Sequence, residues 1–129
     1  MAEKLVLADT SILIEYFRKT NKDGSILMSL FDQGYDFAIS AITHYEVYSG
    51  TTTIQLAFWQ DLLKRTEVLA LDKIVAQSAV DINSELKRKR KQIEIADLFI
   101  AATAIVNNLP FATLNRRHFE RIDGLNLVL

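Results

Sequence analysis

Three carboxylates stand in apolar surroundings at widely separated points of the chain. Asp9 follows the apolar run 4–8, Glu46 lies in the segment ITHYEV, and Asp97 lies in IADLFIAA. A carboxylate on a core-facing element costs several kcal/mol unless a base or a metal ion compensates it. Because no matching bases stand in apolar settings, the three acids predict a site for a hard divalent cation.

Each acid also has a purely structural interpretation. Asp9 is of a type favoured at helix N-caps, and Glu46 could pair with a lysine or with His44 at the surface. Asp97 would gain from the dipole at the start of a helix, although Glu94 is better placed for that role. The three acids together are harder to explain in this way than any one of them.

Strands and helices alternate along the chain, with no linker and no internal repeat. Strands are predicted at 4–8, 37–39, 67–71, 111–114 and 127–129. Helices are predicted around 12–17 with Thr10 or Ser11 as the cap, and at 25–32, 53–65 and 94–107. Two more are predicted, one from the cap Ser40 to about Gly50 and one from the cap Asp72 up to the basic run at 87–91. This order predicts one domain over residues 1–129, a three-layer α/β/α sandwich with a central, mostly parallel sheet.

That architecture predicts where the acids meet. In open α/β sheets, sites lie beyond the carboxyl ends of the strands. Asp9 follows the first strand and Asn115 follows the strand at 111–114, so both project to this edge. Glu46 and Asp97 lie on helices that can turn toward the same edge.

Composition excludes several kinds of protein. The 129 residues carry a net charge of −1 and no cysteine, which excludes disulfides, thiolate zinc sites and cysteine nucleophiles. The start lacks a signal-peptide pattern and no apolar stretch is long enough to span a membrane. These features predict a cytoplasmic protein.

The positive charge is concentrated toward the C-terminal part of the chain. Eight of the 15 bases lie between residues 87 and 121: Lys87, Arg88, Lys89, Arg90, Lys91, Arg116, Arg117 and Arg121. The run at 87–91 either closes a helix, where cations suit the dipole, or binds a polyanion. An adjacent acidic metal site favours the second interpretation.

These motifs, in this order, resemble those of the PIN-domain ribonucleases, and more narrowly the VapC-type toxins of prokaryotic toxin–antitoxin pairs. They are a strand followed by Asp9-Thr10-Ser11, Glu46 before Ser49-Gly50, ADLFIAATA at 96–104, and TLNRRHFERIDGL at 113–125. The resemblance runs from residue 5 to the C-terminus.

The resemblance implies a Mg²⁺- or Mn²⁺-dependent endoribonuclease that cuts single-stranded or looped RNA, often a transfer RNA, and leaves a 5′-phosphate. Asp9, Glu46 and Asp97 match the metal-binding acids of the family. Asn115 stands where many members carry a fourth acid, which puts a second metal in question. The implied partners are a cognate VapB-type antitoxin and a second copy of the chain in a homodimer.

Other side chains are candidates for supporting roles. Thr10, Ser11 and Thr113 could orient the acids or their waters. Phosphate contacts are expected first from Arg116 and Arg117 and next from Lys87, Arg88, Lys89, Arg90 and Lys91. His44 and His118 are interpreted as structural or peripheral.

Three other functions compete with this one. A haloacid dehalogenase-type phosphohydrolase requires Asp-x-Asp, but the third position here is Ser11. A response-regulator receiver requires a lysine at a late strand end, which the segment 113–115 lacks. The remaining alternative is an RNA- or protein-binding module that holds a structural ion.

One apolar stripe has two interpretations. Leu56, Phe58, Trp59, Leu62 and Leu63 recur at helical spacing. They form either core or a dimer interface.

Overall fold

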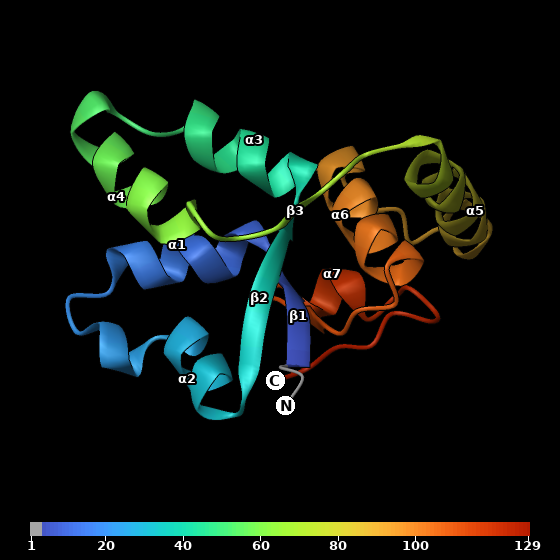
Figure 1. The fold of residues 1–129 in the computed structure, drawn as a ribbon. Coiled ribbons are helices and arrows are strands. Elements are labelled where there is room, and N and C mark those ends of the chain that lie inside the picture. Colours follow the sequence, from blue (N-terminus) through green and yellow to red (C-terminus); the bar gives the residue numbers. More distant parts are fainter. Residues whose placement is uncertain (1–3) are drawn as a thin grey trace.

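A four-stranded parallel sheet is the centre of the fold in the computed structural model, which describes residues 4–129. Its strands are β1 (Lys4–Ala8), β2 (Tyr35–Ser40), β3 (Val68–Leu69) and β4 (Phe111–Ala112), in the order β3-β2-β1-β4 (Figure 1). The chain builds outward from β1 on one side and then returns to its other side with β4. The strand order therefore reverses between β1 and β4, where α/β proteins place their sites.

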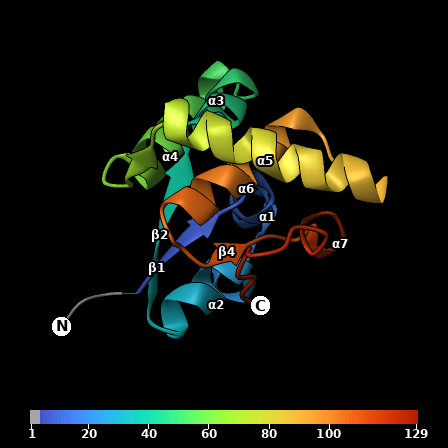
Figure 2. The same cartoon turned by 90° about the vertical axis from the view of Figure 1, so that its right-hand side faces the viewer.

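Helices cover both faces of the sheet. The helices are α1 (Thr10–Arg18), α2 (Ile26–Asp32), α3 (Ala41–Ser49), α4 (Thr53–Leu63), α5 (Lys73–Lys89), α6 (Ile95–Val106) and α7 (Arg116–Phe119), with a 3-10 turn η1 at Lys22–Gly24. Figure 1 shows α1, α2 and α4 on one side of the sheet and α5 and α6 on the other, and Figure 2 shows α5 and α6 side by side. The predicted three-layer α/β/α class is confirmed.

Side chains that alternate between the two faces of the strands form two hydrophobic cores, one on each side of the sheet. Val6 and Ala8 of β1 pack with Phe37 of β2 under α1, α2 and α4. Leu7 and Ala38 point the opposite way and pack under α5 and α6. Successive strand residues face opposite sides of a sheet, so these nearly continuous apolar strands are buried on both faces.

Several predicted boundaries are wrong. The strand expected at 111–114 ends at Ala112, because its partner β1 ends at Ala8 and the chain there turns into α1. The strand expected at 127–129 is reduced to a single bridge between Leu127 and Phe111. The strand expected at 67–71 keeps only Val68–Leu69 and pairs only with β2.

The apolar stripe of α4 belongs to the core. Trp59 and Leu63 are buried, and Phe58 packs against them from a partly buried position. The ring of Phe17 from α1 stacks on Trp59 at 5.2 Å and meets Phe58 edge-on at 5.0 Å. The buried residues of the stripe thus fix α4 against α1.

Lys22 ties off the end of α1. Its ammonium donates to the carbonyl oxygens of Tyr16 and Phe17, each at 2.8 Å, and of Lys19 at 2.9 Å. It also lies over the rings of Tyr16 and Phe58, at 5.1 and 5.3 Å from their centroids. The last carbonyls of a helix lack partners within it, so one cation satisfies several of them.

Across residues 4–129, no helix combines the length and the apolar character needed to cross a membrane.

Replacing Lys22 with Met keeps the apolar stem and removes the ammonium. We expect Lys22→Met to lower the free energy of unfolding by about 2 kcal/mol, since hydrogen bonds from charged groups contribute roughly 1.5–3 kcal/mol. Urea unfolding followed by circular dichroism measures the change. Lys19→Met is the matched control, because within residues 4–129 the Lys19 ammonium forms one salt bridge, with Glu15 at 3.7 Å, and a surface ion pair contributes about 0.2–1 kcal/mol. Equal losses in the two variants would contradict the capping role.

Candidate functional site

Asp9 lies between β1 and α1 and is only 3% exposed. It occupies the N-cap position of α1, yet its side chain makes no capping hydrogen bond. Its Oδ2 atom instead accepts from Ser11 Oγ at 2.8 Å and from Thr113 Oγ1 at 2.7 Å. The expectation that Thr10 or Ser11 caps this helix is wrong, because the helix begins at Thr10 and both hydroxyls serve carboxylates.

One oxygen of Asp9 remains open. Both hydroxyl donors reach Oδ2, and within residues 4–129 no hydrogen bond reaches Oδ1. In the same residues every buried side-chain nitrogen or oxygen has a partner. Oδ1 therefore faces solvent from an otherwise buried side chain, and it is available as a ligand.

The hydroxyls that hold Asp9 are themselves fixed by the backbone. Thr113 Oγ1 accepts from the backbone N–H of Asn115 at 2.9 Å, and Ser11 Oγ accepts from the N–H of Leu114 at 3.1 Å. The N–H of Asp9 donates to the carbonyl of Ala112 at 2.9 Å. This set of bonds joins the carboxyl ends of β1 and β4 into one polar unit.

Glu46 is held from α3 by a second hydroxyl. Thr10 Oγ1 donates to Glu46 Oε1 at 2.7 Å and lies 2.9 Å from Thr43 Oγ1. A hydroxyl has one proton, so donation to Glu46 leaves Thr10 to accept from Thr43. Sequence reasoning missed Thr43. The signal for it is a threonine three residues after the helix-capping Ser40, to whose Oγ its N–H donates.

The surface-pair interpretation of Glu46 is not supported. Among residues 4–129, Glu46 forms no salt bridge with any lysine, arginine or histidine. His44 is exposed, and its ring packs against Tyr48 with 4.7 Å between centroids. No basic side chain among residues 4–129 therefore pairs with this carboxylate.

Asp97 lies in the first turn of α6 and is half-buried. Desolvation raises the pKa of its carboxyl above the usual range, and the negative charges of Asp9 and Glu46 raise this pKa further. His118 acts in the opposite direction. Asp97 therefore lies within the electrostatic fields of Asp9 and Glu46, although the three come from distant parts of the sequence.

The three acids form an open arrangement. Within residues 4–129, no group of three or more His, Cys, Asp or Glu side chains is arranged so that it could hold a metal ion. Mg²⁺ usually binds one or two carboxylates and keeps several waters. An ion bound in this way would need only the open oxygen of Asp9 and one further carboxylate.

Asn115 lies at the same edge of the sheet. It precedes α7, its side chain is exposed, and its N–H reaches Thr113 beside Asp9. Arg116 is less free than expected, since its guanidinium donates to the carbonyl of Leu129 at 2.7 Å. The side chain of Arg117 is exposed.

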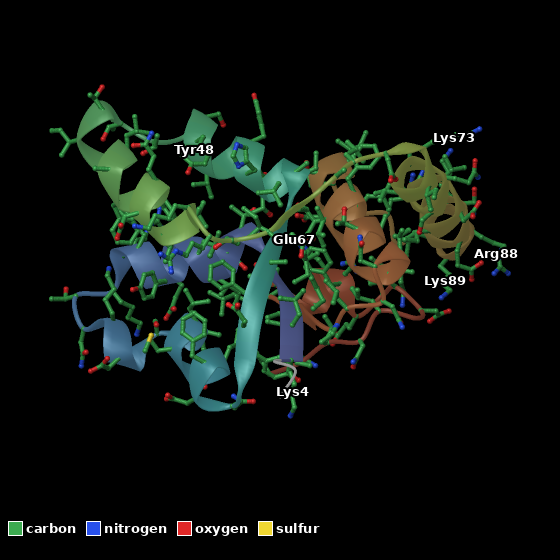
Figure 3. All side chains as sticks on the ribbon, viewed as in Figure 1. Lys4, Tyr48, Glu67, Lys73, Arg88 and Lys89 are labelled. Carbon is green, nitrogen blue, oxygen red and sulfur yellow. The ribbon has the colours of Figure 1, made fainter. Side chains whose placement is uncertain are left out.

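The basic run at 87–91 is partly neutralised. Arg88 pairs with Glu85, and Lys89 lies 3.7 Å from Glu85 and 3.2 Å from Asp123. Figure 3 shows both bases at the far end of α5. Because α5 ends at Lys89, the run places bases in the last turn of the helix, as the dipole interpretation expects.

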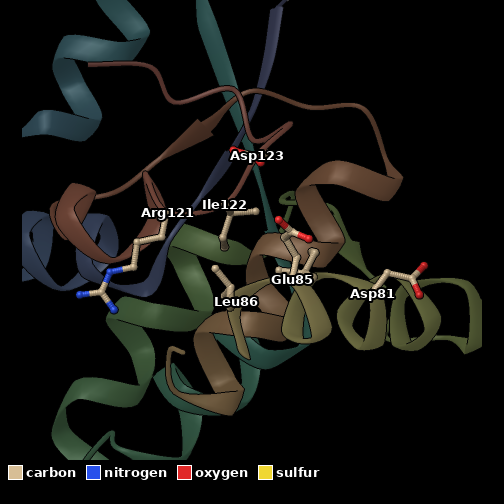
Figure 4. A pocket seen from close by; sticks show the side chains of 7 residues that line it. Asp81, Glu85, Leu86, Arg121, Ile122 and Asp123 are labelled. Carbon is tan, nitrogen blue, oxygen red and sulfur yellow. The ribbon is translucent and has the colours of Figure 1, made fainter. Parts of the chain in front are cut away.

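A pocket of about 210 Å³ lies beside that run. Its walls include Asp81, Glu85, Ile122 and Asp123, and Figure 4 shows the guanidinium of Arg121 turned away from the carboxylates of Asp81 and Glu85. None of the three site acids lines it. The pocket is therefore distinct from the candidate site.

Comparison with known families and proteins finds clear relatives. A family model described as PIN domain matches residues 6–125. Ribonuclease VapC1 of Methanocaldococcus jannaschii is 34% identical over 126 residues, which cover 97% of this chain and 86% of that protein. The tRNA(fMet)-specific endonuclease VapC of Shigella flexneri is 32% identical over 125 residues, which cover 92% of each chain.

Solved structures share the fold along nearly the whole chain. DNA-bound VapBC from Salmonella typhimurium matches with a TM-score of 0.84 and 30% identity, over 98% of each chain. A toxin–antitoxin complex from Klebsiella pneumoniae matches with a TM-score of 0.75 and 27% identity, over 93% of this chain and 94% of that one.

We expect Asp97→Asn to stabilise the metal-free protein at pH 7. A carboxyl whose pKa is raised by folding stabilises the fold only when protonated; this contribution is complete below the unfolded pKa of about 3.9 and is lost as pH rises through the folded value. The advantage of the variant should therefore grow from acid to neutral pH in urea unfolding measurements.

In saturating Mg²⁺, the unmodified protein should instead become more stable than Asp97→Asn. A ligand that binds only the folded state adds about 2.7 kcal/mol at 100 times its dissociation constant, and the variant should lose most of this gain. Glu67→Gln is the control, because Glu67 is exposed (Figure 3). Equal stabilisation of the unmodified protein and of Asp97→Asn by Mg²⁺ would contradict a role for Asp97 in binding the ion.

Proposed function

Because the chain belongs to the PIN-domain family, and within it to the VapC-type ribonucleases, we propose that it is an endoribonuclease toxin that uses Mg²⁺ or Mn²⁺ to hydrolyse RNA phosphodiester bonds. The observation that carries this proposal is the open oxygen of Asp9 beside two further uncompensated acids. Asp9 and Glu46 raise the pKa of Asp97, and no base among residues 4–129 pairs with any of the three.

Asp9, Glu46 and Asp97 would hold the ion through their carboxylate oxygens. When bound, the ion activates a water for attack on phosphorus and offsets the charge that develops on the phosphate oxygens. The chain contributes geometry and charge. Hydroxyl donors hold Asp9 and Glu46 in place without neutralising them, whereas a lysine or arginine partner would cancel the charge that attracts the cation.

Asn115 supplies an amide at the rim of the site. An amide can hold a water or contact a phosphate without adding negative charge. Cleavage of the bond between phosphorus and the 3′ oxygen leaves a 3′-hydroxyl and a 5′-phosphate. His44 takes no part, because its ring is engaged with Tyr48.

The RNA backbone would run over exposed bases near the site. Lys87, Arg90, Lys91 and Arg117 are exposed and form no salt bridge within residues 4–129. Arg88, Lys89 and Arg116 have partners that phosphate would have to displace. The name of the Shigella flexneri relative supports a transfer RNA as the substrate.

A cognate VapB-type antitoxin would silence the enzyme in the cytoplasm. The toxin–antitoxin complex from Klebsiella pneumoniae supports such a partner. We also propose a homodimer. Exposed apolar side chains on four helices offer surface for it: Tyr45, Ile54, Ile74 and Ile95.

The central test is cleavage of total cellular RNA by purified, antitoxin-free protein in Mg²⁺, Mn²⁺ or EDTA. We expect discrete fragments with 5′-phosphates in either metal and none in EDTA. Asp97→Asn should lower the cleavage rate at least about 100-fold, since each 1.4 kcal/mol of lost transition-state stabilisation is tenfold.

Glu67→Gln is again the control and should cleave normally. Fragments that persist in EDTA, or equal rates with Asp97→Asn, would contradict the metal-dependent mechanism. Metal binding without cleavage by folded protein would instead favour the binding module with a structural ion.

A further inference from the structure

A groove of about 500 Å³ runs from the candidate site along the outer face of α1. It begins at Ser11 and Asn115, has Ile14 and Leu114 as apolar walls, and reaches Arg18 in the last turn of the helix. Leu114 is 48% exposed. The groove thus joins the site to an apolar wall and a cation.

Arg18 also borders a second hollow. A pocket of about 250 Å³ is lined by Arg18, Glu46 and Trp59 among others. Each hollow starts at a residue of the site, the first at Ser11 and the second at Glu46. Arg18 is therefore placed where a chain leaving the site on either side of α1 would pass.

The guanidinium of Arg18 is available to bind an anion. Its neighbour Glu15 accepts from the N–H of Ile26 at 3.0 Å and pairs with Lys19 at 3.7 Å. Within residues 4–129, no acidic side chain forms a salt bridge with Arg18, which is exposed. Lys22 is engaged by helix carbonyls. Arg18 is thus the available cation at this end of α1.

The spacing suits a nucleotide strand. Ser11 and Arg18 are two helical turns apart on one face of α1, or about 10 Å along the axis. A stacked strand advances about 3.4 Å per nucleotide, so Arg18 lies within about three nucleotides of the site.

We propose that this face of α1 is the RNA subsite adjoining the cleaved bond, in which Ile14 and Leu114 contact a base and Arg18 binds a backbone phosphate. The inference rests on the proposed ribonuclease function. Arg18 is a substrate-positioning residue and does not touch the reacting atoms.

The test measures binding of a short fluorescein-labelled oligouridylate to full-length protein carrying Asp97→Asn, so that the RNA stays intact. Adding Arg18→Gln should weaken binding about tenfold and reduce the slope of log affinity against log salt by about 0.7, the value for one lost phosphate contact on a single strand. Arg18→Lys should retain the slope.

Lys73→Gln is the matched control, since Lys73 is exposed on α5, far from α1 (Figure 3). It should leave affinity and slope unchanged. In otherwise unmodified protein, Arg18→Gln should keep Mn²⁺ binding by calorimetry, which reports an intact metal site, and raise KM with little change in kcat.

Two results would overturn the inference and are distinguishable. RNA binding with the same affinity and slope after Arg18→Gln removes Arg18 from the substrate path and leaves the ribonuclease proposal standing. No RNA binding by the Asp97→Asn protein, together with no cleavage by the unmodified protein, overturns both. The salt slope separates phosphate contact from a structural role, because a helix-end charge that only stabilises α1 would not change it.

Discussion

The pair of hydroxyl bonds to Asp9 is the interaction on which the site depends. Thr113 comes from the end of β4 and Ser11 from the start of α1, and both donate to one carboxylate oxygen. This carboxylate is nearly fully buried, so the bonds compensate part of its desolvation. They also join the two strands between which the order of the sheet reverses.

The other two acids, Glu46 and Asp97, are brought toward Asp9 by the helices that carry them. α3 leaves the end of β2 with Ser40 as its cap and carries Glu46 to Thr10, the first residue of α1. α6 carries Asp97 into the field of both acids, where its pKa rises. The fold thus assembles negative charges that repel one another, and a bound cation would relieve this repulsion.

Much of the framework could be predicted from sequence because its signals are local. The apolar run before Asp9, the caps Ser40 and Asp72, and the apolar helix around Asp97 all lie where the pattern placed them. Their burial and capping residues are encoded within a few positions of each element.

Other features could not be predicted, because they depend on partners distant in sequence. Asp9, Thr10 and Ser11 are all of types that can cap a helix. The hydrogen bonds that they form instead depend on Thr113 and Glu46, which are distant in the sequence. The strand predicted at 127–129 does not form, because its neighbour β4 is short and pairs with it through a single bridge. Arg18 has no acidic partner within residues 4–129, because the neighbouring Glu15 pairs with Lys19 and accepts a hydrogen bond from the N–H of Ile26.

The single committed oxygen of Asp9 has a consequence for the choice of metal. A carboxylate with one oxygen bound to two hydroxyls can offer an ion only its other oxygen, in monodentate fashion. Ca²⁺ takes six to eight oxygens and readily uses both atoms of a carboxylate, whereas Mg²⁺ takes six in a tight octahedron. By holding Oδ2, Ser11 and Thr113 would leave Asp9 a monodentate ligand, a mode that fits the octahedral geometry of Mg²⁺.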